Sequence, residues 1–323
     1  MKAKIVNKLK EIESEKVKEE ILEGLTSDPR YISPKYFYHE GGSQLFEEIT
    51  RLEEYYPTRT EKAILSDIGE NLELDFTGLN IVELGSGDPS KIRLLLRQIP
   101  SEEQAGLHYY PVDISHSALE GSMLELAEEF PHIKVTAIVA DFLHQFDKLP
   151  KVPNRLFCFL GSTIGNFKPR ERESFMKKLG GEMQPGDHLL LGLDMVKDPQ
   201  VLHRAYNDSQ EVTAAFNKNI LNVVNGIIDT SFDASDFEHL AFYNEKEQRI
   251  EMHLKANRDR QIRINGHQEA LHIKKGETIH TENSYKFKQQ DIENIGQRAG
   301  LTALSVFTDE HQWFSLVLYG KQD

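Results

Sequence analysis

Residues 81–87 read Ile81-Val82-Glu83-Leu84-Gly85-Ser86-Gly87, a mostly apolar strand that runs into a glycine turn. Apolar positions 92, 95 and 96 then indicate a helix. Glycines at such a turn let a ligand approach the backbone, and the next helix offers unpaired N–H groups at its start. The dinucleotide-binding pattern G-x-G-x-x-G is incomplete, because Ser90 stands at the third glycine position. This disfavours an NAD-dependent oxidoreductase.

The chain around this turn has the rhythm of a parallel sheet. Short apolar runs alternate with longer amphipathic segments between residues 79 and 198, as in βαβ units. Between residues 198 and 285 the rhythm breaks, and a helical pattern is followed by the alternation of antiparallel strands. Apolar spacing also predicts a helix over residues 4–25. The predicted strands are 80–84, 108–112, 134–139, 155–160 and 188–193, with a C-terminal hairpin of 303–307 and 314–319.

Composition restricts the kind of partner. The 323 residues suffice for about two domains, and 38 basic against 52 acidic residues leave a net charge of −14. Such a surface repels nucleic acid and anionic membranes, so we predict a small-molecule substrate, with no nucleic acid and no membrane as partner. Cys158 stands alone in an apolar run, which fits a core position in a cytoplasmic protein, and no apolar run approaches the ~20 residues of a membrane span. The histidines lack metal-ligand spacing, so no metal is predicted.

Two acids follow the next two predicted strands. Asp113 ends the second strand and Asp141 ends the third, at the edge where open α/β sheets bind ligands. Asp113 suits a ribose diol, and Asp141 with Phe142 could hold an adenine through a polar contact and an apolar face. Either acid alone is more often a helix cap. Together with Glu83, Gly85 and Gly87, they resemble the S-adenosylmethionine site of class I methyltransferases.

Longer motifs narrow the resemblance. Gly161-Ser162-Thr163-Ile164-Gly165-Asn166 and segments 37–46, 49–59, 204–206 and 213–217 are similar to those of the histidine-specific, S-adenosylmethionine-dependent methyltransferases of ergothioneine biosynthesis. The similarity covers nearly the whole chain from about Ser33. It implies a class I methyltransferase (Rossmann-like) α/β domain of residues 61–196 and 287–323, and a second, α+β substrate-binding domain of residues 1–60 and 197–286. It also implies three methyl transfers that convert L-histidine to its α-N,N,N-trimethyl betaine, hercynine.

The same resemblance assigns the site residues. The family's cofactor contacts fall on Tyr38, Gly85, Lys91, Asp113, Asp141 and Phe142. Its amino-acid contacts fall on Gly161, Thr163, Asn166, Tyr206, Met252, Glu282 and Ser284, and on one tyrosine of the Tyr55-Tyr56 pair. The spacing from Tyr38 favours Tyr55. Asn166 and Tyr38 are expected to act in catalysis.

Physical arguments support some of these assignments independently. Glu282 and Ser284 are two residues apart in a strand-like segment, so their side chains leave on one face, with Asn283 opposite. A carboxylate and a hydroxyl together satisfy the donor and the acceptor of a neutral imidazole, whereas an indole or phenyl ring leaves one or both without a partner. Asn166 follows the fourth strand, where its amide could orient an amine, and Tyr206 could donate to a carboxylate.

Two other functions would use the same cofactor. A methyltransferase of this family could act on another aromatic amino acid or amine, but Glu282 together with Met252 favours histidine. Met252 alternates with Ile250 and Leu254 as core residues do, and only its place in the family suggests a pocket wall. A non-catalytic S-adenosylmethionine-binding module should lack the polar substrate residues around Asn166 and Glu282, which are present.

Overall fold

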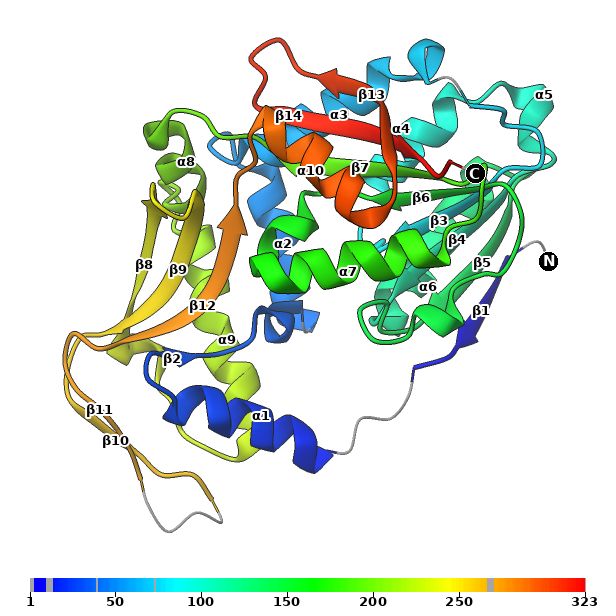
Figure 1. Ribbon diagram of the computed structural model, residues 1–323. Coiled ribbons are helices and arrows are strands. Elements are labelled where there is room, and N and C mark those ends of the chain that lie inside the picture. The colour runs from blue at the N-terminus through cyan, green and yellow to red at the C-terminus, as the bar shows by residue number, and fades with distance from the viewer. Residues whose placement is uncertain (1–2, 10–13, 39, 73, 266–269, 323) are drawn as a thin grey trace. The chain divides into compact units, whose positions relative to one another are not determined.

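The computed structural model describes residues 3–9, 14–38, 40–72, 74–265 and 270–322 (Figure 1). The chain divides into two compact units. The first unit comprises Met1–Lys10, Pro57–Val196 and Lys286–Asp323, and the second comprises Glu11–Tyr56 and Lys197–Tyr285. Within the described ranges, no helix has both the length and the apolar content that crossing a membrane would need.

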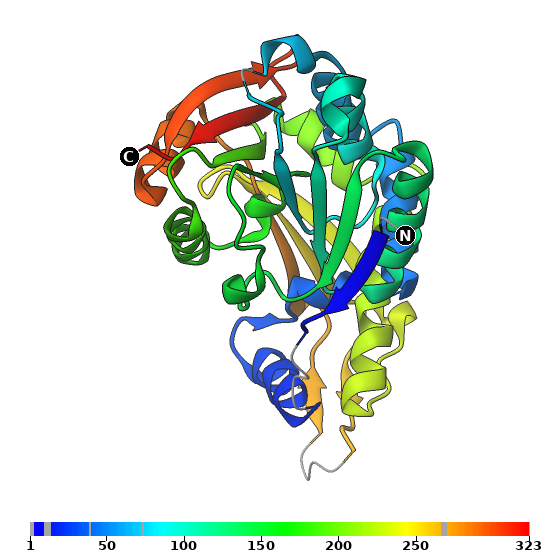
Figure 2. The same cartoon turned by 90° about the vertical axis from the view of Figure 1, so that its right-hand side faces the viewer.

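The first unit is built on a mainly parallel sheet with helices on both faces, as Figure 2 shows. Among the described residues, this sheet has eight strands in the order β1-β5-β4-β3-β6-β7-β14-β13. The first six of these are parallel, whereas β14 pairs antiparallel with β7 and with β13. The strands are β1 (Ala3–Asn7), β3 (Asn80–Leu84), β4 (His108–Asp113), β5 (Lys134–Val139), β6 (Arg155–Phe159), β7 (His188–Asp194), β13 (Thr302–Thr308) and β14 (Phe314–Gly320).

Apolar stripes hold the helices of the first unit to the sheet. In α4, for example, Ile92, Leu95 and Leu96 are spaced to lie on one face, and all three are buried. Cys158 is buried in the same core, as predicted. The helices are α3 (Tyr56–Asp67), α4 (Ser90–Gln98), α5 (Ser101–Gln104), α6 (His116–Glu129), α7 (Pro169–Glu182) and α10 (Gln289–Ala299), with 3-10 helices η2 (Gly69–Asn71), η3 (Phe146–Lys148) and η4 (Thr163–Asn166).

The second unit packs helices against a smaller sheet with the order β2-β12-β9-β8. Helix α9 contacts β8 and β9, and Phe37 stacks on Phe216 of α9 with ring centroids 4.5 Å apart. The strands are β2 (Arg30–Tyr31), β8 (Phe237–Asn244), β9 (Arg249–Ala256) and β12 (Thr278–Tyr285), beside a hairpin of β10 (Arg260–Ile262) and β11 (Leu271–Ile273). The helices are α1 (Ser14–Thr26), η1 (Pro34–Tyr38), α2 (Glu40–Arg51), α8 (Pro199–Tyr206), α9 (Val212–Ile228) and η5 (Ala234–Asp236).

The structure confirms the predicted sheet and corrects the N-terminus. Strands β3 to β7 begin at the predicted residues, and β13 and β14 form the predicted hairpin. The helix predicted over residues 4–25 is confirmed from Ser14, where α1 begins, but it is wrong over residues 4–7, because β1 pairs in parallel with β5. β-branched Ile5 and Val6 suit a strand, and pairing with a sheet edge outweighs a helical spacing of apolar residues. Residues 1–10 therefore belong to the first unit, not to the domain predicted for residues 1–60.

The chain leaves the first unit and re-enters it at two segments that are hydrogen-bonded to each other. Met195 and Phe287 form a parallel bridge, in which the Phe287 N–H donates to Asp194 at 2.9 Å and the Val196 N–H donates to Phe287 at 2.8 Å. The Lys286 ammonium lies 2.7 Å from Oδ2 of Asp194, and both side chains are fully buried. The ends of the inserted segment are thus fastened together by backbone and by charge.

A second buried ion pair ties the starts of β6 and β7. Arg155 Nε donates to Oδ2 of Asp187 at 2.9 Å, and the Arg155 backbone N–H donates to Oδ1 at the same distance. The remaining guanidinium N–H groups reach the carbonyls of Pro150 and Glu182. Asp187, at the turn before the last parallel strand, therefore serves the stability of the sheet.

Asp187→Ala should lower the free energy of unfolding by about 3–5 kcal/mol, because it leaves the Arg155 guanidinium buried without a counter-charge. Urea unfolding followed by circular dichroism measures this. The control is Glu173→Ala, which removes a solvent-accessible partner of Lys177 and Arg298 and should leave the unfolding midpoint nearly unchanged. An unchanged midpoint for Asp187→Ala would contradict the role of this pair.

Candidate active site

The glycine turn after β3 forms an open cradle. Gly85 and Gly87 have positive φ angles of +70° and +33°, a conformation that glycine adopts without strain. A methyl group added at Gly87 would meet nothing within 4 Å, and one at Gly85 would meet only the Phe142 ring, at 3.5 Å. Asp113 binds this turn, because its Oδ2 accepts from the Gly87 N–H at 3.2 Å. The structure therefore brings Gly85, Asp113 and Phe142 together.

The two acids have different surroundings. Asp113 also accepts from the Ser115 N–H at 2.9 Å, and burial raises the pKa of its carboxyl against the opposing effect of these backbone donors. Asp141 accepts from the N–H groups of Leu143 and His144, at 2.9 and 3.3 Å, and its Oδ2 lies 2.7 Å from Nδ1 of His144. Asp141 thus caps its own turn, whatever further ligand it holds.

The turn after β6 lies beside Lys91. Gly161 has a φ of +73°, and a methyl group added there would lie 2.9 Å from Nζ of Lys91. Thr163 Oγ1 donates to the Leu160 carbonyl at 2.9 Å, and partly buried Asn166 ends η4. Since β6 is the parallel neighbour of β3, the two turns stand at the same edge of the sheet.

Glu61 joins these parts and was not among the predicted site residues. Its fully buried carboxylate lies 2.7 Å from Nζ of Lys91 and accepts from the Gly161 N–H at 2.8 and 3.0 Å. The sequence does hold a signal for it. Glu61 shares the spacing of buried Ile64, Leu65 and Ile68, so a charged residue stands on the apolar face of α3.

Most of the predicted amino-acid contacts belong to the second unit. Glu282 of β12 is opposite Met252 of β9, and both are nearly inaccessible, with 7% and 2% exposure. The Tyr206 hydroxyl, from α8, donates to Oγ of Ser284 at 2.7 Å. Asn283, whose Oδ1 lies 3.0 Å from Nε2 of His280, separates the two strand residues as the alternation predicts.

The two adjacent tyrosines have different neighbours within the second unit. The Tyr55 ring meets the Tyr206 ring edge-on, with centroids 6.2 Å apart. Tyr56 is buried, and its hydroxyl accepts from Nζ of Lys197 at 2.8 Å. This placement favours Tyr55 as the residue beside the predicted contacts. Tyr38 ends η1, but its side chain lies outside the described residues.

A buried network supports Tyr206 and β12 and was also missed from the sequence. Fully buried Asn217 places Nδ2 2.9 Å from Nδ1 of His239, and its Oδ1 accepts from Thr281 at 2.7 Å. Burial lowers the pKa of His239, and its Nε2 donates to the Tyr206 carbonyl at 2.9 Å. Asn217 stands in the motif 213–217, which is the signal that the sequence offered.

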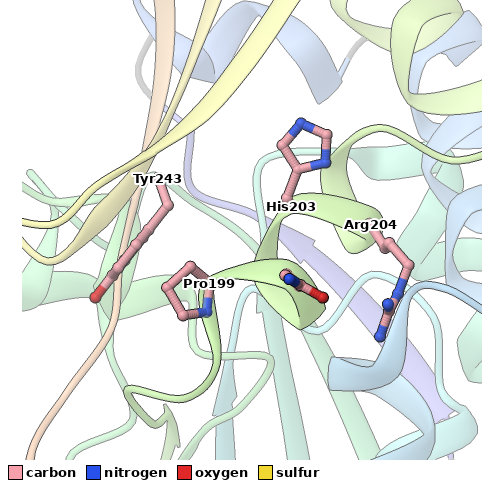
Figure 3. Close-up of a pocket in the computed structure, with 5 residues that line it drawn as sticks. Pro199, His203, Arg204 and Tyr243 are labelled. Atoms are coloured by element: carbon pink, nitrogen blue, oxygen red, sulfur yellow. The ribbon is translucent and has the colours of Figure 1, made fainter.

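A separate hollow of about 500 Å³ lies between α8 and β8 of the second unit (Figure 3). Pro199, Gln200, His203, Arg204 and Tyr243 line it. None of the predicted site residues is in this lining, so the hollow is not assigned to the active site. The described residues hold no group of three or more His, Cys, Asp or Glu side chains placed to bind a metal ion.

A model of the family described as histidine-specific methyltransferase, SAM-dependent, matches residues 17–321. The chain belongs to this family. It is 40% identical over 305 residues to the histidine N-alpha-methyltransferase of Mycolicibacterium smegmatis, covering 94% of this chain and 95% of that one. The protein of the same name from Mycobacterium tuberculosis is 39% identical over 306 residues, with the same coverage. A 4-dimethylallyltryptophan N-methyltransferase of Claviceps purpurea is 25% identical over 315 residues, covering 90% of this chain and 91% of that one.

Membership of this family confirms the resemblance found in the sequence. The chain is an S-adenosylmethionine-dependent methyltransferase, and its first unit has the predicted Rossmann-like α/β sheet. The open glycine turn beside Asp113 and Phe142 fits such a cofactor, since a ligand can approach the backbone there without displacing a side chain. The incomplete dinucleotide pattern is consistent with this assignment.

Glu83 lies in β3, two residues before Gly85 of the glycine turn. Its side chain is buried and hydrogen-bonded to Tyr109. The Tyr109 hydroxyl donates to Oε2 of Glu83. Burial raises the pKa of Glu83 to about 8. Between its ordinary pKa and this value, the folded protein holds a proton at Glu83 that the unfolded chain has released. This group therefore makes the free energy of unfolding fall as pH rises through that range.

Glu83→Gln should flatten the loss of stability between about pH 5 and pH 8, because the amide keeps the shape of the protonated acid and cannot ionise. Urea unfolding at several pH values in this window would compare the slopes of the variant and the parent. If both lose stability equally as pH rises, Glu83 does not carry the raised pKa.

Proposed function

We propose that this chain transfers methyl groups from S-adenosylmethionine to the α-amino group of L-histidine, three times in succession, to give the trimethyl betaine hercynine for ergothioneine biosynthesis. The observation that supports histidine as the substrate is the group of buried polar side chains in the second unit, Glu282, Ser284 and Tyr206. Buried polar groups impose a penalty on any ligand that cannot pair with them, so they select a ring with both a donor and an acceptor.

The first unit would hold the cofactor. Gly85 and Asp113 would take the ribose, with Asp141 and Phe142 at the adenine and Lys91 at the amino-acid end. Tyr38, the remaining predicted cofactor contact, belongs to the second unit. When bound, S-adenosylmethionine supplies a methyl group on a sulfonium that leaves as a neutral thioether. No residue of the chain needs to form a covalent intermediate, so the protein's tasks are orientation and exclusion of water.

The second unit would hold the amino acid. Glu282 would accept the imidazole N–H, and Ser284 would donate to the other ring nitrogen. The Tyr206 hydroxyl donates to Oγ of Ser284 at 2.7 Å, so Tyr206 helps to hold the Ser284 hydroxyl in place. Tyr206 has a single hydroxyl hydrogen, so donation to the substrate carboxylate would require it to leave Ser284. Met252 and Tyr55 would form apolar walls.

The amine must present a lone pair. An α-amine has a pKa of about 8, so at neutral pH part of the bound substrate must lose a proton, and a nearby sulfonium would favour the neutral form. Asn166 would orient the amine, because its side-chain oxygen would accept a hydrogen bond from an amine N–H. Gly161 and Thr163 would lie beside the substrate in the same turn. Each transfer leaves a different hydrogen to be lost, and the third leaves none.

Incubation with S-adenosylmethionine and a mixture of the twenty amino acids should yield mono-, di- and trimethylhistidine, with every methyl group on the α-nitrogen. Asn166→Ala should slow each transfer, by up to ~10²-fold if the amine shifts by roughly 1 Å. Tandem mass spectrometry locates the methyl groups. Methylation of the imidazole would overturn the proposed orientation, and binding of the cofactor without any product would favour a non-catalytic module.

Glu282→Ala should reduce histidine turnover while relaxing the discrimination against tryptophan and phenylalanine. The reason is that the variant loses both a partner for the imidazole and the penalty on apolar rings. Competition between histidine and tryptophan, read by mass spectrometry, gives the ratio of kcat/KM values. Glu282→Gln is the matched control, because it retains one acceptor oxygen. A Glu282→Ala enzyme with the parent's preference for histidine would contradict this recognition.

A further inference from the structure

The buried carboxylate of Glu61 has no place in the function described so far. It enters from α3 and is fully inaccessible, so it cannot touch a ligand directly. Its contacts in the first unit are Nζ of Lys91, at 2.7 Å, and the backbone N–H of Gly161, at 2.8 and 3.0 Å. The Glu61 carboxylate therefore links the start of α4 to the turn after β6.

The space for this carboxylate is built by two glycines. A methyl group added at Gly192 of β7 would lie 2.5 Å from Oε1 of Glu61, and one added at Gly161 would lie 2.9 Å from Nζ of Lys91. Real side-chain carbons do not approach so closely, and the obstacle at Gly192 is a carboxyl group that is already held by its partners. Residues from α3, α4, β7 and the turn after β6 thus fit around a single ion pair.

Electrostatics explain why Lys91 needs this partner. Lys91 is in the first turn of α4, where the helix dipole is positive and disfavours a cation. The negative charge of Glu61 offsets that effect and holds the ammonium close to the Gly161 turn. Lys91 has three N–H donors and its side chain is 20% exposed, so it can bind Glu61 and still reach a ligand.

We propose that Glu61 is a positioning residue, which fixes Lys91 to receive the carboxylate at the amino-acid end of the cofactor and fixes the Gly161 turn that leads to Asn166. The inference rests on the proposed function and adds a residue to it. It assigns to Glu61 no contact with either reactant. Its effect on binding passes through the Lys91 ammonium.

The test compares two ligands that differ only at the amino-acid end. S-Adenosylhomocysteine has the carboxylate, whereas 5′-methylthioadenosine has the same nucleoside and thioether without it. Glu61→Gln should weaken S-adenosylhomocysteine by roughly 10- to 100-fold, the range for losing a hydrogen bond to a charged group, and should leave 5′-methylthioadenosine nearly unchanged. Calorimetry measures both affinities. Glu173→Gln, at a solvent-accessible position of α7, is the control for the change in net charge.

A double-mutant cycle shows whether Glu61 acts through Lys91. In a Lys91→Met background, Glu61→Gln should cause little further loss of S-adenosylhomocysteine affinity, because the group that it positions is gone. The double variant also removes both members of the ion pair together, so it keeps the cycle measurable if Glu61→Gln alone folds poorly. Full additivity of the two losses would overturn the proposal.

The remaining outcomes are equally decisive. Equal weakening of both ligands by Glu61→Gln would mean a purely structural role, and unchanged affinity for both would mean no role; either overturns the positioning of Lys91. Those results leave the proposed function intact if the parent binds S-adenosylhomocysteine and methylates histidine. If the parent binds no S-adenosylhomocysteine, the proposed function fails first, and the inference about Glu61 fails with it.

Discussion

The first unit depends on a backbone constraint at one edge of its sheet, where the chain must turn with positive φ directly after β3 and again after β6. Gly85 and Gly161 meet it, with φ of +70° and +73°. Since β3 and β6 are paired neighbours, the two turns stand side by side. A side chain at position 161 would strike Lys91, so the second turn fixes both the backbone and its cationic neighbour.

In the second unit, the constraint is that polar side chains buried on β12 need hydrogen-bond partners. On β12, Ser284 is bonded to Tyr206, while the intervening Asn283 serves His280 on the other side. Buried Asn217, from α9, accepts a hydrogen bond from Thr281 of the same strand. Because unpaired buried groups are costly, this network allows little rearrangement without loss of stability, and that rigidity is what selective recognition requires.

The sequence predicted what depends on short segments and missed what depends on distant partners. The strands, the glycine turn and Asp113 are local patterns, and the structure has them where they were expected. The capping role of Asp141 was an open alternative, and its contacts with Leu143 and His144 support it. β1 could not be predicted, because its pairing with β5 depends on residues more than a hundred positions away. The Gly161 N–H from which Glu61 accepts is 100 positions away, so this contact could not be predicted either, although the place of Glu61 on an apolar helix face is a local signal.

The buried ion pair of Asp194 and Lys286, where the inserted segment begins and ends, has an evolutionary consequence. Because the inserted segment begins and ends at the bridge between Met195 and Phe287, its interior can change without altering the register of β7 against β14. Selection could then remodel residues 197–285 while the parallel sheet of the first unit stays the same. Relatives named for histidine and for a prenylated tryptophan are what such a modular history would produce.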